Sequence, residues 1–395
     1  MKDFSEKKTQ FWLNTAHFTN DIYTGMLNPI MPFIAAKLGI TMAIATIVLS
    51  LSHICASLLQ PIYGFFADNL HRRVFIFWGI LFTSLFISLA PSVNNLALLI
   101  AFVIIGSMGS SFFHPQALGL AVRFTKTDIA KNMGVFMGLG TLGFALGPIV
   151  SSGITQLFGL EKIPFLAVLG ITVAISMFYF IPKINQDGLE QKSHEDFIHT
   201  FKSILSNRRL NLLNLIAMLK TLVTTSSCIL LPFLWKGLGH SAFYIGFALF
   251  AFNFAGGLGA FISRRFELKV GTKNVFYFSM ILTFPMMLIF MLTYKVFPTF
   301  ALTVFILMGL IQWMAVPVTM VMAQATIPEY KSIIGGFING FSWGVVAILM
   351  TGIGFIAQAK GIIPVLVTVS AIPAVLSFPI IKRLFKLLDE KELEN

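Results

Sequence analysis

Residues 76–90 read IFWGILFTSLFISLA, a run with no charged side chain in which bulky apolar residues follow one another without alternation. Lengthened at each end by uncharged residues, the run reaches the roughly 20 residues that a helix needs to cross about 30 Å of hydrocarbon. A membrane β-barrel would instead show alternating polarity in segments of roughly ten residues. The run therefore predicts a membrane-spanning α-helix, and similar runs recur along the chain.

The composition agrees with a chain that lies mostly in lipid. Of 395 residues, 56% are hydrophobic and 11% are charged, whereas ordinary soluble domains carry roughly 25% charged residues. The two cysteines, Cys55 and Cys228, fall within predicted spans and lie far apart in sequence. We therefore expect neither a disulfide framework nor a cysteine-based metal cluster.

Polar breaks between the apolar runs divide the chain into twelve predicted spans. The segment Met1–Gln10 is polar, and the long apolar segment after it contains ionisable residues and lacks a small-residue cleavage site, so we expect the first span to be retained. The predicted spans are residues 11–36, 42–68, 74–92, 95–122, 131–157, 163–182, 210–235, 241–263, 274–294, 298–325, 332–358 and 361–381.

The 28 lysine and arginine residues predict the orientation of these spans. With both termini in the cytoplasm, 22 of them fall in cytoplasmic segments and five in outer loops, which leaves Lys220 alone inside a span. This asymmetry follows the positive-inside rule and predicts a multi-pass protein of the bacterial inner membrane. Contact with membrane lipid also accounts for the net charge of +12, so nucleic acid is not an expected partner.

Short motifs recur at an offset of 200 to 202 residues, as expected for a transporter built from two parallel repeats. Pro115 recurs as Pro317, and Gly134 recurs as Gly335. The sequence thus predicts an all-α membrane protein of two pseudo-symmetric six-helix bundles. Its predicted parts are an N-terminal bundle at 1–183, a cytoplasmic linker at 184–209 and a C-terminal bundle at 210–395.

The end of the second predicted span reads GFFADNLHRR at residues 64–73. With a glycine, an aspartate four positions later and two closing basic residues, this stretch resembles the loop signature of the major facilitator superfamily. The resemblance implies a twelve-helix fold that works by alternating access. The glycine would let a neighbouring helix approach closely. We interpret four residues here as a conformational latch, namely Gly64, Asp68, Arg72 and Arg73.

The fifth predicted span carries a glycine-proline pattern that resembles the one associated with exporters of the same superfamily. The pattern consists of Gly134, Gly143, Gly147 and Pro148. We interpret these residues as packing and hinge positions rather than as ligands. Two further stretches, Gly109–Pro115 and His17–Asp21, look like the corresponding stretches of the fosmidomycin-resistance group of drug efflux proteins.

Charges inside a membrane span are costly, by at least about 2.5 kcal/mol each on insertion scales, so each embedded charge needs a reason. Of the 16 acidic residues only Asp21 lies deep within a predicted span, and Lys220 is equally deep in the seventh span. By the repeat offset, we expect these two charges to face each other in the cavity that the family resemblance places between the halves. His17 precedes Asp21 by four residues and shares its helix face. It could therefore tune the acidity of Asp21 or relay the proton of Asp21. A static buried ion pair is the structural alternative.

Other polar or aromatic side chains inside spans are candidates for lining the same cavity. His114, His53 and Gln60 could contact substrate or carry protons, and packed, hydrogen-bonded side chains are the alternative interpretation. We expect no metal site, because no spacing brings two histidines and a carboxylate onto one helix face. Trp313 and Trp343 lie near the middle of their spans, where they could wall the cavity or simply fill the core.

No catalytic or nucleotide-binding motif is apparent, so we expect a transporter rather than an enzyme, with no cofactor and with the proton gradient as its energy source. The leading hypothesis is a monomeric, proton-coupled antiporter that exports a small drug-like or anionic solute. The glycine-proline pattern of the fifth span and the resemblance to efflux proteins both indicate export. The predicted proton-coupling and substrate-binding residues are Asp21, His17, Lys220, His114, His53, Gln60, Trp313 and Trp343.

Two alternatives stay open at this level. In the first, Asp21 supports a proton symporter that imports an organic anion such as a siderophore or a carboxylate. In the second, the chain is a non-transporting membrane scaffold or sensor. Such a protein would need neither the embedded charges of Asp21 and Lys220 nor two related halves.

Overall fold

The computed structural model describes residues 6–60, 62–63, 74–125, 128–182, 202–327 and 331–393. Within these ranges every regular element is a helix. Ten helices of the described part are long and apolar enough to cross a membrane, judged by length and composition. Helices α1, α2 and α3 occupy the first two predicted spans, which completes the twelve-span all-α fold predicted from the sequence.

The chain divides into two compact units. The first is Met1–Phe197 with Pro232–Phe250, and the second is Ile198–Leu231 with Ala251–Asn395. The elements up to the second unit are α1 (Glu6–Gly25), α2 (Leu27–Leu38), α3 (Met42–Ser57), α5 (Val74–Leu89), η1 (Ala90–Ser92), α6 (Leu96–Arg123), α7 (Ile129–Phe158), η2 (Leu160–Leu166) and α8 (Ala167–Phe180).

The remaining elements begin with α10 (Arg208–Gly237) and α11 (Ala242–Val270), whose adjoining ends, through Phe250, belong to the first unit. The others lie in the second unit. They are α12 (Thr272–Ile281), α13 (Thr283–Thr293), α14 (Pro298–Trp313), α15 (Ala315–Gln324), α16 (Lys331–Gly336), η4 (Phe337–Phe341), α17 (Ser342–Lys360) and α18 (Ile362–Leu393).

Prolines divide three of the predicted spans into two helices each. A proline has no amide hydrogen, and its ring clashes with the carbonyl four residues earlier, so the helix is weakened at that carbonyl. Helix α1 ends four residues before Pro29, α12 ends four residues before Pro285, and α14 ends four residues before Pro317. In contrast, α6 continues through Pro115 without a break.

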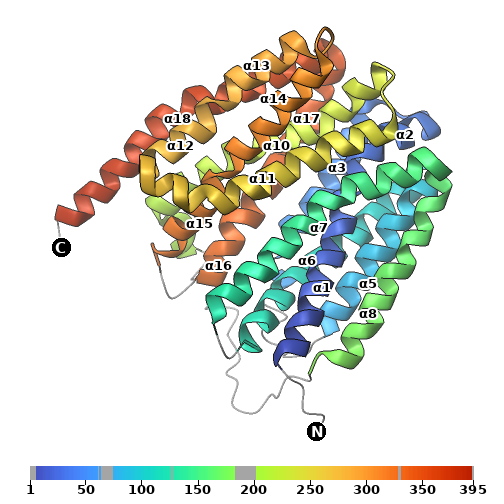
Figure 1. The fold of residues 1–395 in the computed structure, drawn as a ribbon, viewed down its shortest axis with the longest axis horizontal. Coiled ribbons are helices and arrows are strands. Elements are labelled where there is room, and N and C mark those ends of the chain that lie inside the picture. The colour runs from blue at the N-terminus through green and yellow to red at the C-terminus, as the bar shows by residue number, and fades with distance from the viewer. Residues whose placement is uncertain are drawn as a thin grey trace. The chain divides into compact units, whose positions relative to one another are not determined.

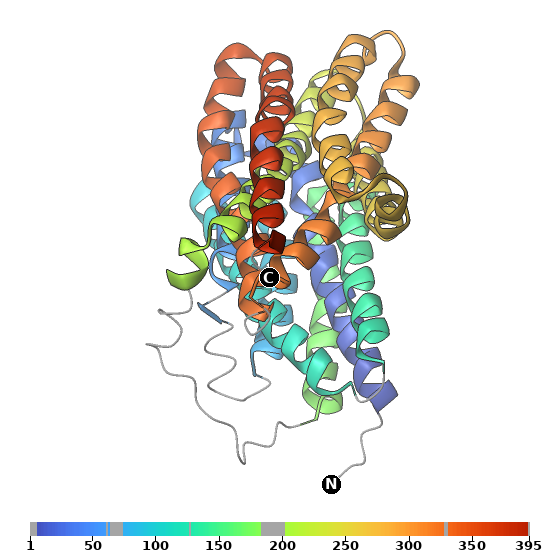
Figure 2. The same ribbon diagram turned by 90° about the vertical axis from the view of Figure 1, so that its left-hand side faces the viewer.

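In the first unit, α1 is packed against four other helices. Figures 1 and 2 show α1 beside α7, and α1 also contacts α5, α6 and α8. The core between these helices is apolar and includes Leu13 and Phe113, both fully buried. This packing positions the C-terminal part of α1, where Asp21 lies, inside the bundle rather than toward lipid.

Three loops that the sequence places on the same side of the membrane meet at one end of the first unit. The ammonium group of Lys37, at the end of α2, donates to the carbonyl oxygens of Pro91 at 3.3 Å and Ser92 at 2.9 Å. It also forms an ion pair with Glu161 at 2.7 Å. The loops after the first, third and fifth spans are therefore linked to one another by the side chain of Lys37.

The second unit has its own apolar core. Fully buried residues of this core include Leu213 on α10, Phe276 on α12 and Ile381 on α18. Figure 1 shows α18 beside α12 and α13, and the same pairs of helices are in contact. The core surrounds the middle of α10, so the side chain of Lys220 is held within the protein.

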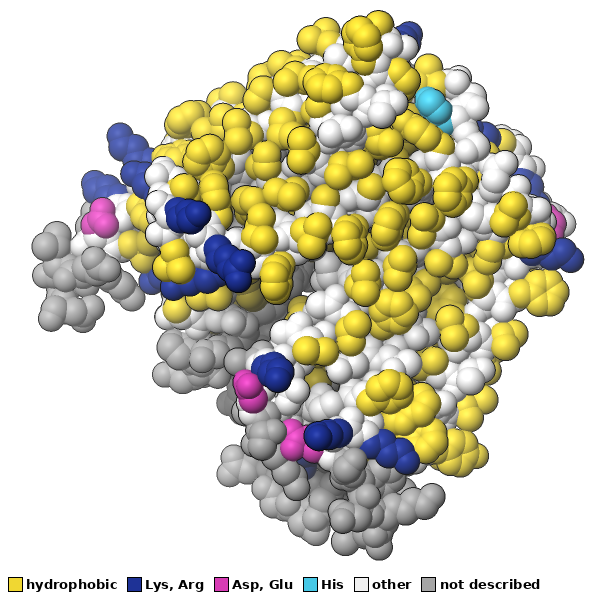
Figure 3. Space-filling view, viewed as in Figure 1, with side chains coloured by type: hydrophobic (Ala, Val, Ile, Leu, Met, Phe, Trp, Pro, Cys, Tyr) yellow, Lys and Arg dark blue, Asp and Glu magenta, His cyan; other side chains and the backbone are white. Residues whose placement is uncertain are grey.

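Many large apolar side chains are exposed on the outer surface of the helices. In Figure 3, hydrophobic side chains are spread across the visible face, and basic side chains lie mainly toward its edges. Phe261 on α11 and Leu292 on α13 are 81% and 79% exposed. Such exposure of large apolar side chains is expected where lipid is the solvent.

Candidate functional site

Asp21 is held between two histidines in the middle of the first unit. Its Oδ2 atom lies 3.3 Å from Nε2 of His17, one helical turn earlier on α1. Its Oδ1 atom lies 3.0 Å from Nε2 of His114 on α6. The carboxylate side chain is only 12% exposed. We refer to His17, Asp21 and His114 as the His-Asp-His triad.

The other ring nitrogens of the triad are bonded to the backbone. Nδ1 of His17 lies 2.9 Å from the carbonyl oxygen of Phe136 on α7. Nδ1 of His114 lies 2.9 Å from the carbonyl oxygen of Ser110 and 3.1 Å from its hydroxyl. These bonds fix the orientation of both rings, so each Nε2 atom points at the carboxylate.

Asn20 supports the carboxylate from the same helix. Its Nδ2 atom donates to Oδ1 of Asp21 at 3.0 Å, and it lies 3.5 Å from the hydroxyl of Ser110. Asn20 is fully buried, and its Oδ1 atom has no hydrogen-bond partner among the described residues. The sequence interpretation did not include Asn20 among the candidates, although it is the immediate neighbour of Asp21.

The triad depends on close packing between α1 and α7. A Cβ atom at Gly140 would overlap the imidazole ring of His17, and one at Gly143 would overlap the carbonyl oxygen of Phe18. A Cβ atom at Gly147 would likewise overlap the carbonyl oxygen of Ile22. Glycine at these positions therefore allows the two backbones to approach closely.

The glycine pattern of the fifth span is only partly a packing pattern. Gly143 and Gly147 contact α1 as described, and Pro148 contacts Gly25. A Cβ atom at Gly134 would meet no described atom within 4 Å. The sequence interpretation left out Gly140, which is the glycine that faces the triad. Its position three residues before Gly143 was the sequence signal that could have placed it on the same packing face.

The triad also revises the argument against a metal site. Each of its three residues offers a possible ligand atom, and these atoms lie within 4.8 Å of one another. The sequence argument considered one helix face at a time and so missed that α6 supplies the second histidine. Each Nε2 atom faces a different carboxylate oxygen, which is the pattern of two separate hydrogen bonds, and we treat the triad as a proton-bearing group.

Lys220 lies in the second unit, 8% exposed, on α10. Its ammonium group lies 4.8 Å from the ring centroid of Trp313, within the range of a cation–π interaction. Gln312 donates to the carbonyl oxygen of Lys220 at 3.3 Å and accepts from the hydroxyl of Thr224 at 2.9 Å. Lys220 forms no ion pair with a described residue of its own unit.

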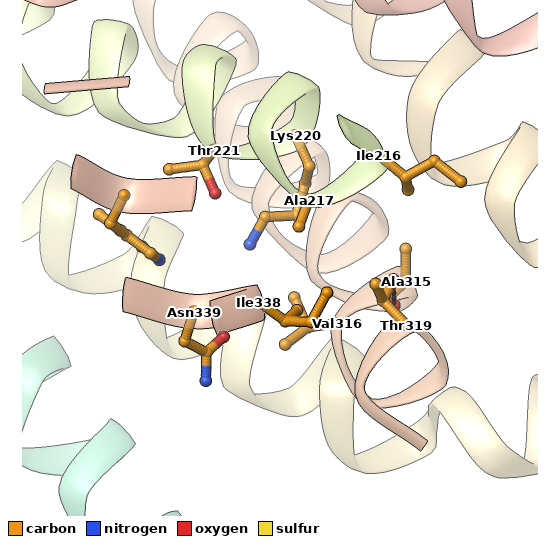
Figure 4. A pocket seen from close by; sticks show the side chains of 10 residues that line it. Ile216, Ala217, Lys220, Thr221, Ala315, Val316, Thr319, Ile338 and Asn339 are labelled. Carbon is orange, nitrogen blue, oxygen red and sulfur yellow. Dashed lines mark hydrogen bonds between the residues drawn. The ribbon is translucent and has the colours of Figure 1, made fainter. Parts of the chain in front are cut away.

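A small pocket opens beside Lys220. Figure 4 shows the lysine ammonium directed into this pocket, near the side chains of Thr221 and Asn339. Asn339 belongs to the π-helical turn η4, a type of distortion that is frequent at functional sites. The pocket is lined by Ile216, Ala217, Lys220, Thr221, Ala315, Val316, Thr319, Ile338, Asn339 and Trp343.

The remaining sequence candidates fall in different places. Trp313 and Trp343 lie beside Lys220 and in its pocket. The side-chain amide of Gln60 donates to the carbonyl oxygen of Ala56 at 2.8 Å, within its own helical segment. His53 lies on α3 and is partly buried. The predicted latch residues, Gly64, Asp68, Arg72 and Arg73, lie outside the described residues.

The predicted pairing of Asp21 with Lys220 stays a prediction. Asp21 belongs to the first unit and Lys220 to the second. The described ion-pair partners of Asp21 in its own unit are His17 and His114. The sequence interpretation placed His17 on the helix face of Asp21 but predicted no contact between His114 and Asp21.

Each unit buries ionisable side chains among apolar helices long enough to cross a membrane, as is typical of a multi-pass membrane transporter and not of an enzyme. A sequence profile of the Major Facilitator Superfamily matches residues 13–351. The chain therefore belongs to the Major Facilitator Superfamily.

Comparison with individual proteins agrees with this membership. The chain is 27% identical over 359 residues to the fosmidomycin resistance protein of Escherichia coli (strain K12), covering 89% of this chain and 86% of the relative. It is 23% identical over 158 residues to a quinolone resistance protein of Staphylococcus aureus, covering 40% and 41% of the two chains.

The fold is also similar to solved structures of transporters. The crystal structure of a POT family transporter in complex with 5-aminolevulinic acid matches with a TM-score of 0.78. The match covers 95% of this chain and 96% of the other, at 12% sequence identity. A likeness at this level of identity establishes the fold alone.

Proposed function

We propose that the protein is a proton-coupled antiporter that exports a small drug-like or anionic solute by alternating access. The observation that carries this proposal is the His-Asp-His triad, an embedded carboxylate whose two oxygens each face an imidazole nitrogen. Embedded ionisable groups are costly and are therefore retained mainly for function. Three titratable groups in direct contact form a site that can gain and lose protons as access alternates.

The proposed direction, outward, rests on two observations. The relatives described above are named for resistance to fosmidomycin and to quinolones, and removal of a toxic compound from the cell is the way in which a transporter would confer such resistance. The glycine pattern of the fifth span, typical of exporters by resemblance, is used here in the contact between α1 and α7. We place the protein in the bacterial inner membrane with both termini in the cytoplasm, because that orientation puts 22 of the 28 basic residues on the inner face.

The proposed solute contact is the pocket beside Lys220. An ammonium group that forms no ion pair with a described carboxylate of its unit, next to the hydroxyl of Thr221 and the amide of Asn339, suits an anionic or polar group on the solute. The aromatic ring of Trp343 lines the same pocket and could contact an apolar part of the solute.

Proton symport is the second candidate function. In that case the same triad would drive the uptake of an organic anion, and the pocket beside Lys220 favours such a solute equally. The two functions differ in the direction of coupled flow, so a transport measurement separates them.

The test uses purified protein reconstituted in liposomes, with fosmidomycin and norfloxacin, a quinolone, as probes. An imposed gradient that drives protons inward should expel the probe if the protein is an antiporter and accumulate it if the protein is a symporter. A tolerance screen of a deletion strain against many toxic compounds and nutrients would identify further solutes. Absence of any proton-dependent flux for every solute found by the screen would contradict both functions.

Lys220→Ala is expected to weaken transport of anionic solutes by about 10- to 100-fold, since a hydrogen bond to a charged group contributes about 1.5 to 3 kcal/mol. Cationic solutes should be affected much less. The measurement is the concentration dependence of transport for an anionic and a cationic solute of similar size.

Lys269→Ala is the matched control for this substitution, because Lys269 is exposed at the end of α11. It removes the same charge outside the pocket and should leave both solutes unaffected. Equal losses for the anionic and the cationic solute in Lys220→Ala would favour a structural role for Lys220.

A further inference from the structure

The ring nitrogens that face Asp21 present lone pairs to it. The carbonyl oxygens of Phe136 and Ser110 can only accept hydrogen bonds, and each lies 2.9 Å from an Nδ1 atom of the triad. Nδ1 of His17 and Nδ1 of His114 therefore both donate, and in a neutral imidazole this leaves the lone pair on Nε2. Both Nε2 atoms face oxygens of Asp21. A cation is needed to bring these electron-rich atoms into favourable contact, and a metal ion meets this need as well as protons do.

Histidine ligands of metal ions make the same kind of supporting bond. A ligating histidine almost always donates its other ring N–H to a carbonyl, a carboxylate or water, which fixes the tautomer and aims the free nitrogen at the ion. In the triad this partner is a backbone carbonyl for each ring, on α7 for His17 and on α6 for His114. The amide of Asn20 supports the carboxylate of Asp21 in a similar way, by donating to its Oδ1 atom at 3.0 Å. The supporting bonds of a metal site are thus already formed.

The spacing of the triad fits binding of a single four-coordinate ion. Bonds of about 2.0–2.1 Å place two ligand atoms of a tetrahedral zinc ion about 3.3 Å apart. The contacts between an Nε2 atom and a carboxylate oxygen measure 3.3 Å for His17 and 3.0 Å for His114. The same bond lengths place the centroids of two imidazole ligands about 5 Å apart, and the centroids of these two rings are 5.4 Å apart. All ligand atoms lie within 4.8 Å of one another, so small side-chain movements complete the site.

The types of ligand determine which ion the site would select. Imidazole ligands suit zinc, iron, nickel and copper, whereas magnesium and calcium prefer oxygen ligands alone. We propose that the triad is a binding site for one divalent transition-metal ion, which joins α1 to α6 through His17, Asp21 and His114. Among the described residues, no other group of three or more histidine, cysteine, aspartate or glutamate side chains lies as close together.

An unpaired polar atom beside the triad suits a water molecule on such an ion. Three protein ligands leave a coordination position open, which water or substrate fills in catalytic zinc sites. Oδ1 of Asn20 is a hydrogen-bond acceptor without a partner among the described residues, although its side chain is fully buried. The same amide group contacts the carboxylate of Asp21. A metal-bound water would supply the donor that this oxygen lacks.

The two histidines differ in how an ion can reach them. The side chain of His17 is 5% exposed, and its ring stacks on Phe136 with centroids 4.2 Å apart and contacts the backbone at Gly140. The side chain of His114 is 27% exposed, and its Nδ1 partner lies on its own helix. We therefore expect an ion to enter past His114. Once bound, the ion occupies the lone pairs that otherwise take protons, so it should inhibit proton-driven transport. This effect rests on the proton coupling proposed above, whereas binding itself does not.

The test is a titration of the full-length protein, purified without a histidine tag, with Co²⁺ as a spectroscopic substitute for Zn²⁺. Visible absorption of Co²⁺ is much more intense with four or five ligands than in the six-coordinate hydrated ion. We expect one equivalent of Co²⁺ per chain to give the intense spectrum. Zn²⁺ should displace it and Mg²⁺ should not. A spectrum unchanged from hydrated Co²⁺, or displacement by Mg²⁺ at equal concentration, would overturn the proposal.

Substitutions identify the ligands. Loss of a group that only orients a ligand typically costs about 10- to 100-fold in metal affinity, and we expect a loss in this range for Asn20→Ala. His114→Gln and Asp21→Asn each remove a ligand, so the loss should exceed about 100-fold. His240→Gln is the matched control, because His240 stacks on Tyr244 outside the triad, and it should bind Co²⁺ as the native protein does. Native affinity in His114→Gln, or an equal loss in His240→Gln, would contradict the proposed site.

X-ray absorption at the zinc K-edge keeps the test decisive if a variant does not fold, because it uses the native protein with one equivalent of Zn²⁺. We expect two imidazole ligands together with oxygen ligands at about 2.0–2.2 Å. Oxygen ligands alone, or a single imidazole, would overturn the proposal. In liposomes the bound Zn²⁺ should also stop proton-driven transport. The expected ligands together with unchanged transport would establish the metal site and contradict proton coupling at the triad, so the two failures are distinguishable.

Discussion

Asp21→Asn is expected to abolish gradient-driven transport while leaving the protein inserted and folded. Asparagine has nearly the same size as aspartate, but it cannot ionise, so the triad loses the carboxylate that both imidazole rings contact. A coupling free energy of 1 to 3 kcal/mol corresponds to a change of about 5- to 150-fold. We therefore expect accumulation of solute against its gradient to fall by about 5- to 150-fold.

The measurement compares two modes of transport in the same liposomes, with a solute identified by the tolerance screen. Proton-driven accumulation should be lost, and exchange of labelled for unlabelled solute, which needs no net proton movement, should persist. Glu161→Gln is the matched control, because it removes a carboxylate whose side chain is 63% exposed. Normal proton-driven accumulation in Asp21→Asn would show that the coupling site lies elsewhere in the protein.

Gly143→Ala is expected both to lower the stability of the first unit and to reduce the transport rate. Its added Cβ atom would overlap the carbonyl oxygen of Phe18, a backbone atom that cannot move unless α1 separates from α7. Overpacking of this kind costs about 1 to 3 kcal/mol. Separation of these helices would also weaken the bond from His17 to Phe136 and so disturb the triad.

Gly153→Ala is the control on the same helix, because a Cβ atom there would meet no described atom within 4 Å. It should leave stability unchanged or raise it slightly, as alanine is the better helix former. Thermal unfolding in detergent and transport rate are the two measurements. Equal effects of the two substitutions would show that contact between α1 and α7 is not what makes Gly143 necessary.

The role of the glycine pattern illustrates what local sequence can and cannot predict. The spacing of Gly143 and Gly147 predicted a packing face, and both do contact the backbone of α1. The same pattern included Gly134, where there is open space, and omitted Gly140, which faces His17. A glycine is required only where a partner helix comes close, and the partner is not specified by the helix that carries the glycine.

The candidate site shows the same limit. The four-residue spacing of His17 and Asp21 predicted that they share a helix face, and their side chains are indeed 3.3 Å apart. His114, 93 positions beyond Asp21, was a candidate for lining the cavity, and no sequence signal predicted its contact with Asp21. Its contact with Asp21, and the carbonyl partner of His17 on α7, depend on how three helices pack.

By itself, the sequence determined the environment, the secondary structure and the number of spans, because hydrocarbon length and the cost of unpaired backbone groups act on each segment separately. It also determined which few side chains are costly enough inside the membrane to need a function. Only the tertiary structure decided how those side chains are arranged: which histidine completes the triad, which glycines permit it, and where the pocket beside Lys220 opens. These features depend on contacts between segments far apart in the chain, and such contacts are set by the packing of whole helices.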